Sequence, residues 1–197
     1  ITKNDARGDA PLLAGDINAN LIMKARFQGV VDTPASSTRT LLVEVILTGT
    51  SGGTRTISVP FQVQPGGIWS ATQEVKGVSS LEKFTVTIKG PKHLSKIICS
   101  ARPVETVGGT YQCKGDSFEL VVGDNQLDFS NIVLLAGDLP VQNSIVDSVD
   151  IVYIRQNFGN TSSDILSRGD LNLDGIIDTQ DFSMVLAALG FKYDEDL

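Results

Sequence analysis

Residues 168–182, RGDLNLDGIIDTQDF, carry oxygen-bearing side chains at a regular spacing. Counted from Asp170 as position 1, oxygen ligands fall at positions 1, 3, 5, 9 and 12 and a glycine falls at position 6. Calcium takes about six to eight hard oxygen ligands, and this spacing wraps the chain around one ion, with a backbone carbonyl at position 7. We call residues 170–181 the second loop. Its predicted calcium ligands are Asp170, Asn172, Asp174, Ile176, Asp178 and Asp181.

Three details of the second loop give further expectations. Asp181 at position 12 has a shorter arm than the glutamate of an EF-hand, so the geometry should differ from that motif. Ile177 at position 8 is expected to pair through its backbone with a counterpart in another loop, and Thr179 is expected to cap the following helix. The alternative is a polar turn that binds no metal.

A weaker copy of this pattern precedes it by about 31 residues: SVDIVYIRQNFG (148–159) aligns with TQDFSMVLAALG (179–190). Counted back from Asp150 as position 12, Asp138 lies one residue too far upstream, and Ser144 stands where glycine is expected. We call residues 138–150 the first loop. Its candidate ligands are Asp138, Asn143, Ile145, Asp147 and Asp150. The sequence thus predicts one calcium ion or two, because the first loop could instead be held by its own hydrogen bonds.

Two helices are predicted to anchor these loops. Asp150 to Phe158 and Asp181 to Leu189 each place apolar residues at spacings of three and four. Each is followed by a glycine, Gly159 or Gly190, which is expected to end the helix in a left-handed conformation.

The chain before residue 137 has a different period. Short apolar runs rich in β-branched residues alternate with clusters of Gly, Pro, Ser and Thr, which is typical of an antiparallel β-sandwich. The runs are 21–31, 39–49, 55–63, 68–75, 84–90, 95–101, 111–123 and 127–135. We therefore predict two domains, an all-β antiparallel sandwich over 1–136 and a small α-helical calcium-binding domain over 137–197, with repeats at 138–159 and 170–190.

Charge and composition narrow the function. The net charge of −7 lies in the tail, because residues 138–197 hold 11 Asp and Glu against 3 Lys and Arg. This acidity argues against nucleic acid as a partner, and no apolar run is long enough for membrane insertion. A polysaccharide partner is not favoured either, since the single tryptophan, Trp69, lies within a strand pattern. The only histidine, His93, lies beside two lysines in GPKHLSK, and no serine, cysteine or paired carboxylates stand out with a base near them, so we expect no enzyme activity.

Cys99 and Cys113 end and begin strand-like runs, and the glycine pair 108–109 between them favours a hairpin that brings them together. A disulfide would close a loop of about 15 residues and fit an oxidising compartment. The alternatives are two buried free thiols or, less favoured, reactive cysteines.

The duplicated loop and helix, with Asp at position 12 and Ser or Thr at position 10, resembles the type I dockerin domain over residues 137–197. The resemblance implies antiparallel helices around two calcium ions and docking onto a cohesin partner module outside the cell. Partner-binding positions map onto Ser148, Val149, Arg155 and Gln156 in the first copy and Thr179 and Gln180 in the second. The second copy departs from the family, with Leu186 and Ala187 where basic residues occur, so this pair is expected to pack on the sandwich.

The N-terminal part contains, in this order, VEVILTG, GGIWSATQEV, FTVTIKGPKHL and LDFSNIVLLAGD. With this order of segments, residues 1–136 resemble the prealbumin-like, or carboxypeptidase regulatory-like, sandwiches of bacterial surface or secreted proteins. Together the resemblances predict a secreted or surface-exposed prokaryotic protein. Two roles follow from them. The chain is either a calcium-dependent interaction module with a cohesin-like partner, or a structural stalk in which the helical domain packs on its own sandwich without such a partner.

Overall fold

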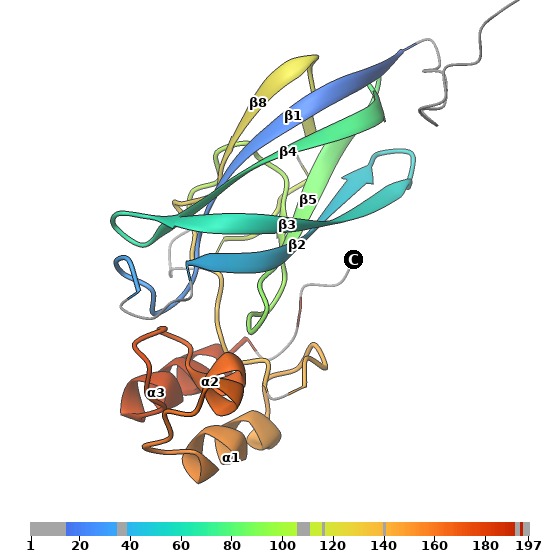
Figure 1. The fold of residues 1–197 in the computed structure, drawn as a ribbon. Coiled ribbons are helices and arrows are strands. Elements are labelled where there is room, and N and C mark those ends of the chain that lie inside the picture. Colours follow the sequence, from blue (N-terminus) through green and yellow to red (C-terminus); the bar gives the residue numbers. More distant parts are fainter. Residues whose placement is uncertain are drawn as a thin grey trace, which may run out of the picture.

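The computed structural model describes residues 15–34, 39–105, 111–115, 117–139, 141–191 and 194. This part of the chain forms a curled β-sheet followed by three short helices (Figure 1). The strands are β1 (Asp16–Arg26), β2 (Thr40–Gly49), β3 (Thr54–Gln64), β4 (Ile68–Ser79), β5 (Lys83–Lys89), β6 (Lys96–Ile98), β7 (Phe118–Glu119) and β8 (Gly123–Asp128). The helices are α1 (Ser148–Gln156), α2 (Ser163–Gly169) and α3 (Thr179–Ala188).

The strand order is β6-β5-β2-β3-β4-β1-β8, with β7 paired to β5 beside this path. The named pairs are antiparallel except β1 with β8, which run parallel from Ala19↔Gly123 to Lys24↔Asp128. The prediction of a purely antiparallel arrangement is therefore wrong at this edge. Alternation of apolar residues determines which face a side chain takes but not the direction of the neighbouring strand.

The sheet curls because β3 and β4 pair over a short stretch only. Gln62–Gln64 pair with Ile68–Ser70, and beyond this hairpin the two strands follow different neighbours, β2 and β1. Strand β2 shows the expected alternation of buried and exposed residues. Inward-facing side chains from both halves of the sheet form one core, whose fully buried members include Leu21, Met23, Val43, Val45, Phe61, Trp69, Val86, Ile88 and Phe129.

The predicted runs over 111–123 and 127–135 are only partly strand. Within the described residues, the first contributes only the short β7, and the last strand covers 123–128. Asn125 explains part of this difference. Its side chain accepts the N–H of Val121 at 2.8 Å and donates to the Val121 carbonyl at 2.9 Å, so those backbone groups are already bonded and do not enter a ladder.

Helices α1 and α3 lie close to the predicted helices, whereas α2 was not predicted. Gly159 has the expected left-handed φ of +76°, but Gly190 does not adopt that conformation, and Leu189, the C-cap of α3, lies in the right-handed helical region. The helix caps are Asp147 and Asp178, so the prediction that Thr179 caps α3 is wrong by one residue. None of the helices in the described residues is long and apolar enough to cross a membrane.

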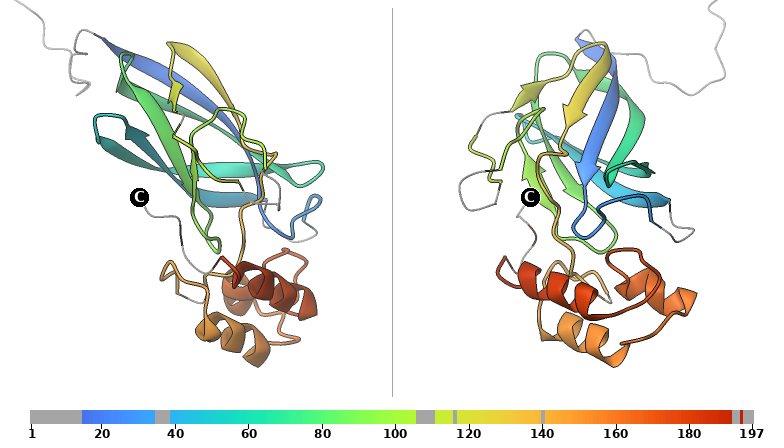
Figure 2. Two further views of the ribbon diagram at one scale, coloured as in Figure 1. Left: turned by 180° about the vertical axis from the view of Figure 1, so that it is seen from behind. Right: turned by 90° about the vertical axis from the view of Figure 1, so that its left-hand side faces the viewer.

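The helices rest against one end of the sheet (Figure 2), and the two regions exchange core residues. Leu94, in the β5–β6 connection, packs with the apolar residues of the helices, while Leu173 from the second loop belongs to the core of the sheet. Contact is close at Gly29, where a Cβ atom would lie 2.3 Å from the sulfur of Met184. The helical region therefore has its own apolar cluster, to which the sheet contributes Leu94.

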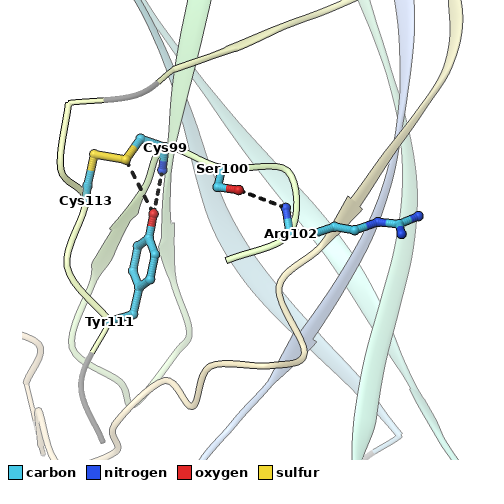
Figure 3. Close-up of a disulfide and its surroundings, with 5 residues drawn as sticks. All are labelled: Cys99, Ser100, Arg102, Tyr111 and Cys113. Atoms are coloured by element: carbon cyan, nitrogen blue, oxygen red, sulfur yellow. Dashed lines mark hydrogen bonds between the residues drawn. A yellow bond between two sulfur atoms is a disulfide. The ribbon is translucent and has the colours of Figure 1, made fainter. Parts of the chain in front are cut away.

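Cys99 and Cys113 are joined by a disulfide, with their Cα atoms 5.5 Å apart (Figure 3). The Tyr111 hydroxyl lies beneath this bridge, accepts the N–H of Cys99 at 3.2 Å and is 3.4 Å from the Cys99 sulfur. Tyr111 is 7% exposed and packs in the core of the sheet. The bridge thereby fastens an irregular segment to the sheet. The glycine pair 108–109 of the predicted hairpin lies outside the described residues.

Replacing both cysteines, as in Cys99→Ser/Cys113→Ser, is expected to lower the free energy of unfolding by about 3 kcal/mol, because the unfolded chain regains the freedom of a loop of roughly 15 residues. Urea unfolding followed by circular dichroism measures the change. Dithiothreitol should bring the wild type to the level of the variant and leave the variant unaltered. Equal stability of the oxidised wild type and the variant would contradict this expectation.

Candidate functional site

The second loop begins at Asp170, where α2 ends, and folds back around the carboxylate of this residue. Asp170 is 3% exposed and its carboxylate accepts the N–H groups of Asp174 at 3.2 Å and Gly175 at 3.0 Å. Gly175 has φ +93°, a left-handed conformation that glycine adopts at little cost. The sharp turn predicted at position 6 therefore points the N–H groups of Asp174 and Gly175 at the carboxylate of Asp170.

The loop ends at Asp181 in the first turn of α3, and this side chain is 0% exposed. Its carboxylate accepts the N–H of Leu171 at 2.7 Å and that of Asp178 at 2.9 Å. Asp178 in turn accepts the N–H of Gln180 at 2.7 Å, which completes a capping box with Asp181. Asp181 therefore ties the start of the loop to the start of the helix.

The rim of the loop carries the remaining predicted ligands. Asn172 accepts the N–H of Asp174 at 3.2 Å and donates its amide to the Asp174 carboxylate at 2.9 Å. Asp174 also accepts the N–H of Ile176 at 3.1 Å. Asp174 is exposed and Asn172 is partly exposed, so the rim oxygens face solvent.

Ile177 at position 8 pairs with the chain that follows α1, not with the first loop as predicted. The N–H of Ile177 donates to the Asn160 carbonyl at 3.1 Å, and the Gly159 N–H donates to the Ile177 carbonyl at 2.8 Å. Ile177 itself is buried in the helical core. Gly159, in its left-handed conformation, therefore ends α1 and also turns the chain towards the second loop.

Burial is the largest cause of the pKa shifts of the charged groups at the second loop. It raises the pKa of Asp170 and of Asp181 above the usual value, although backbone N–H groups oppose the shift. Lys92, from the β5–β6 connection, is 7% exposed and donates to the backbone carbonyls of Asp170 at 2.6 Å and Leu166 at 3.5 Å. Burial lowers the pKa of Lys92 to about 8, against the attraction of the two aspartates.

The donor chemistry of the second loop fits a hard divalent cation. Two buried carboxylates with amide and carbonyl oxygens beside them suit calcium, whose charge would offset the cost of burying the acids. In the described residues, no group of three or more His, Cys, Asp and Glu side chains is gathered as a metal site, and the end carboxylates are bonded to N–H groups. A carboxylate offers about four acceptor positions, more than the N–H groups bonded to Asp170 or to Asp181, so each keeps capacity for a cation. The residues that would hold the ion are Asp170, Asn172, Asp174, Ile176, Asp178 and Asp181.

The first loop repeats this arrangement. The Asp138 carboxylate accepts the N–H groups of Asn143 at 2.9 Å and Ser144 at 3.2 Å, as Asp170 accepts those of its own loop. Asp150 accepts the N–H groups of Leu139 at 2.5 Å and Asp147 at 2.6 Å, and it forms the capping box of α1. Asp138 and Asp150 are each 1% exposed, and burial raises the pKa of Asp150. The structural duplication therefore extends beyond the aligned helices.

The first loop also differs from the second. Its first bonded amide is five residues beyond Asp138, whereas the second loop has a separation of four, which accords with the inserted residue read from the sequence. Ser144 takes the place of glycine with φ +68°. Ile145 donates its N–H to Asn143 at 3.0 Å, as Ile176 donates to Asp174 in the second loop, but the acceptor here is a neutral amide oxygen and not a carboxylate.

The predicted partner residues lie on the surface of α1 and α3. All are exposed: Ser148, Val149, Arg155, Gln156, Thr179 and Gln180. Ser148, Val149 and Gln156 line a shallow hollow together with Val152 and Tyr153. Leu186 and Ala187 are also exposed, so the expectation that they pack on the sheet is wrong; α3 turns Met184 towards Gly29 instead.

Two lysines from the sheet and the connection after it contact the loops and were not predicted from the sequence. Lys89 and Lys92 stand near His93 in KGPKHLSK, a segment considered only for catalysis. In the structure Lys89 contacts Asp138 and Lys92 contacts Asp170. The signal that could have identified them is complementary charge, since this short basic segment precedes a tail of net negative charge.

Because the Lys92 ammonium is buried, the free energy of unfolding should change with pH in the alkaline range. A folded pKa of about 8 against an ordinary 10.5 means that the unfolded chain binds more protons between these values, so stability should rise as pH increases through that window. In chelator, the gain should be on the order of 1–3 kcal/mol and should be absent in Lys92→Met. Urea unfolding at pH 7.5 and 10 measures it, with the exposed Lys24→Met as the control that keeps the gain. The same pH dependence in Lys92→Met would contradict the assignment.

The chain was compared with known protein families, curated proteins and solved structures, and none of the three comparisons gives a match.

Proposed function

We propose that the second loop binds calcium and that residues 137–197 form a dockerin-like calcium-binding domain attached to a β-sandwich domain over residues 1–136. The observation that carries this proposal is the buried pair Asp170 and Asp181, held at positions 1 and 12 around a left-handed Gly175. Two buried acids without a cation are costly, whereas a hard divalent ion makes the same burial favourable. Asp138, Asn143, Ile145, Asp147 and Asp150 form the weaker copy.

The domain is proposed to act as a calcium-dependent interaction module outside the cell, with a cohesin-like module as its partner. Support comes from the exposed side of α1 and α3. Val149 is 55% exposed and Leu186 46% exposed, and neither is covered by the sheet. The face that carries the predicted partner residues is thus open, while the helices meet the sheet through other residues.

The alternative role is that of a brace, and the exchange of core residues favours it. Leu173 is buried in the core of the sheet, and Leu94 is buried among the helices. Such packing would hold the helical domain in a fixed orientation on its own sandwich. In this role calcium stiffens a stalk, and no cohesin partner is needed.

A non-enzymatic role outside the cell is part of the proposal. The Cys99–Cys113 disulfide fits an oxidising compartment, as a secreted or surface protein of a prokaryote would meet. His93 is 2% exposed, packs on Phe27 with ring centroids 4.7 Å apart, and has its pKa lowered to about 3 by burial. A neutral, buried imidazole of this kind suits packing, not proton transfer to a substrate.

Calcium binding is tested by Asp174→Ala, which removes an exposed predicted ligand with little loss of packing. The wild type should gain about 3 kcal/mol of stability at free calcium about 100-fold above its Kd, because the ion binds only the folded state. The variant should lose most of this gain and keep the stability of the wild type in chelator. Thermal unfolding with calcium and with EDTA measures both quantities.

The control for this test is Asp164→Ala, which removes an exposed acidic side chain of α2 outside both loops. It should keep the gain in calcium that the wild type shows. Asp181→Ala is a poorer probe, because Asp181 also bonds two backbone N–H groups and its loss should destabilise the chelated protein as well. If calcium raises the stability of the wild type and of Asp174→Ala equally, the ion does not bind at the second loop.

The two roles are separated by binding to a panel of cohesin modules. For an interaction module, a pull-down should recover a complex in calcium and not in EDTA, and Val149→Asp should weaken it at least tenfold because a charge enters the contact. Ser167→Asp, at an exposed position of α2, is the matched surface control. Failure of every cohesin to bind in calcium would leave the bracing role.

A further inference from the structure

We propose that the ammonium group of Lys89 serves the first loop as a built-in cation, so that this loop folds on a charge supplied by the sheet and binds no calcium. The comparison with the second loop rests on the proposed function, but the ion pair itself does not. The chain would accordingly bind one calcium ion, at the second loop, although the two loops share one architecture.

The ion pair lies at the position that opens the first loop. The Lys89 ammonium nitrogen is 2.9 Å from an Asp138 carboxylate oxygen and 2.6 Å from an oxygen of Asp194. The side chain of Asp138 is 0% exposed, and those of Lys89 and Asp194 are each 17% exposed. At this degree of burial, an ion pair with good hydrogen-bond geometry is strongly felt when one partner is removed.

Asp194 fixes the lysine from the other side. Its second carboxylate oxygen accepts the N–H of Ser95 at 2.7 Å, and its own N–H donates to the Ser144 carbonyl at 3.0 Å. The Lys89 ammonium thus lies between Asp138, which opens the first loop, and Asp194, which is bonded to both the β5–β6 connection and the first loop. Lys89 ends β5, whose pairing with β2 includes Lys89 opposite Glu44, so its backbone is fixed by the ladder.

The second loop has a different relation to its lysine. Lys92 donates to the backbone carbonyls of Asp170 and Leu166, and the bonds found on the Asp170 carboxylate come from the N–H groups of Asp174 and Gly175. The Lys92 ammonium thus attracts the Asp170 carboxylate but is bonded to carbonyl oxygens, so in the described residues no ammonium hydrogen bond occupies this carboxylate and its oxygens stay open to a cation from solution. The corresponding carboxylate of the first loop already has one.

The first loop also lacks oxygen ligands that a calcium ion would need. Around the insertion, the exposed Val141 supplies no side-chain oxygen, and the Gln142 amide donates to the carbonyls of Gly90 and Pro91 in the sheet connection. Asn143 is neutral where the second loop has Asp174. A divalent ion at Asp138 would have fewer anionic ligands and would lie close to an ammonium group that repels it.

A double-mutant cycle tests the pair in the full chain. Lys89→Met, Asp138→Asn and the double variant are unfolded in urea with EDTA present, where calcium has no part. We expect a coupling between the two residues of about tenfold or more in the unfolding equilibrium constant. The matched cycle of Lys24→Met and Asp128→Asn, an exposed pair 3.7 Å apart, should give a coupling within about twofold. Absence of coupling between Lys89 and Asp138 would overturn the proposal.

Calcium counting by isothermal titration supplies the second measurement. The wild type should bind one ion, Asp138→Asn should still bind one, and Asp174→Ala should bind none. A bound ion in Asp174→Ala, or loss of one of two ions in Asp138→Asn, would show that the first loop holds calcium and would overturn the proposal. If the wild type binds no calcium, the proposed function fails, while the cycle in EDTA still decides the role of Lys89. If an Asp138 variant does not fold, the count in Asp174→Ala decides.

Discussion

Burial of four aspartates is the constraint on which the helical region depends. Asp138, Asp150, Asp170 and Asp181 are the buried acidic side chains in the described part of the chain, and they occupy the first and last positions of the two loops. A carboxylate removed from water must be compensated by hydrogen bonds or by a cation. Backbone N–H groups supply the hydrogen bonds in all four cases, and this need determines how each loop turns and where each following helix begins. The remaining charge has to be met from the sheet or from solution.

The sheet meets part of that need, and this makes the two regions interdependent. Lys89 and Lys92 come from the end of β5 and the connection that follows it, close to Leu94, which is buried among the helices. Leu173 makes the reverse connection by entering the core of the sheet. A module that binds through α1 and α3 would therefore transmit its orientation to the sheet, since Leu94 and Leu173 pack across the two regions. The interaction and bracing roles are for this reason compatible in one molecule, although only one requires a partner.

Short-range features of this structure were predictable from the sequence and long-range ones were not. The spacing from Asp170 to Asp181 and the period of α1 and α3 depend on neighbours within about four residues, so local rules identified them. The parallel pairing of β8 with β1, the short helix α2 and the contacts of Lys89 depend on residues far apart in the chain. Gly190 shows the limit even locally, because a glycine after a helix permits a left-handed end but does not require it. Period-two alternation likewise indicated buried faces without giving the curl of the sheet.

On the proposals made for calcium and for Lys89, the differences between the two loops follow from the source of their positive charge. A loop that closes on a solution ion needs several oxygens at strict spacing, so changes in its length or ligands reduce binding. A loop that closes on a lysine fixed by a β-ladder needs one carboxylate within reach, and the other positions are free to change. On the proposal made for Lys89, the inserted residue, the neutral Asn143 and the strained Ser144 of the first loop are tolerated because the ammonium had already replaced the ion. On the same proposal, the second loop needs Gly175 and its larger set of acids to hold a solution ion, since the Lys92 ammonium attracts the Asp170 carboxylate but is bonded to carbonyl groups.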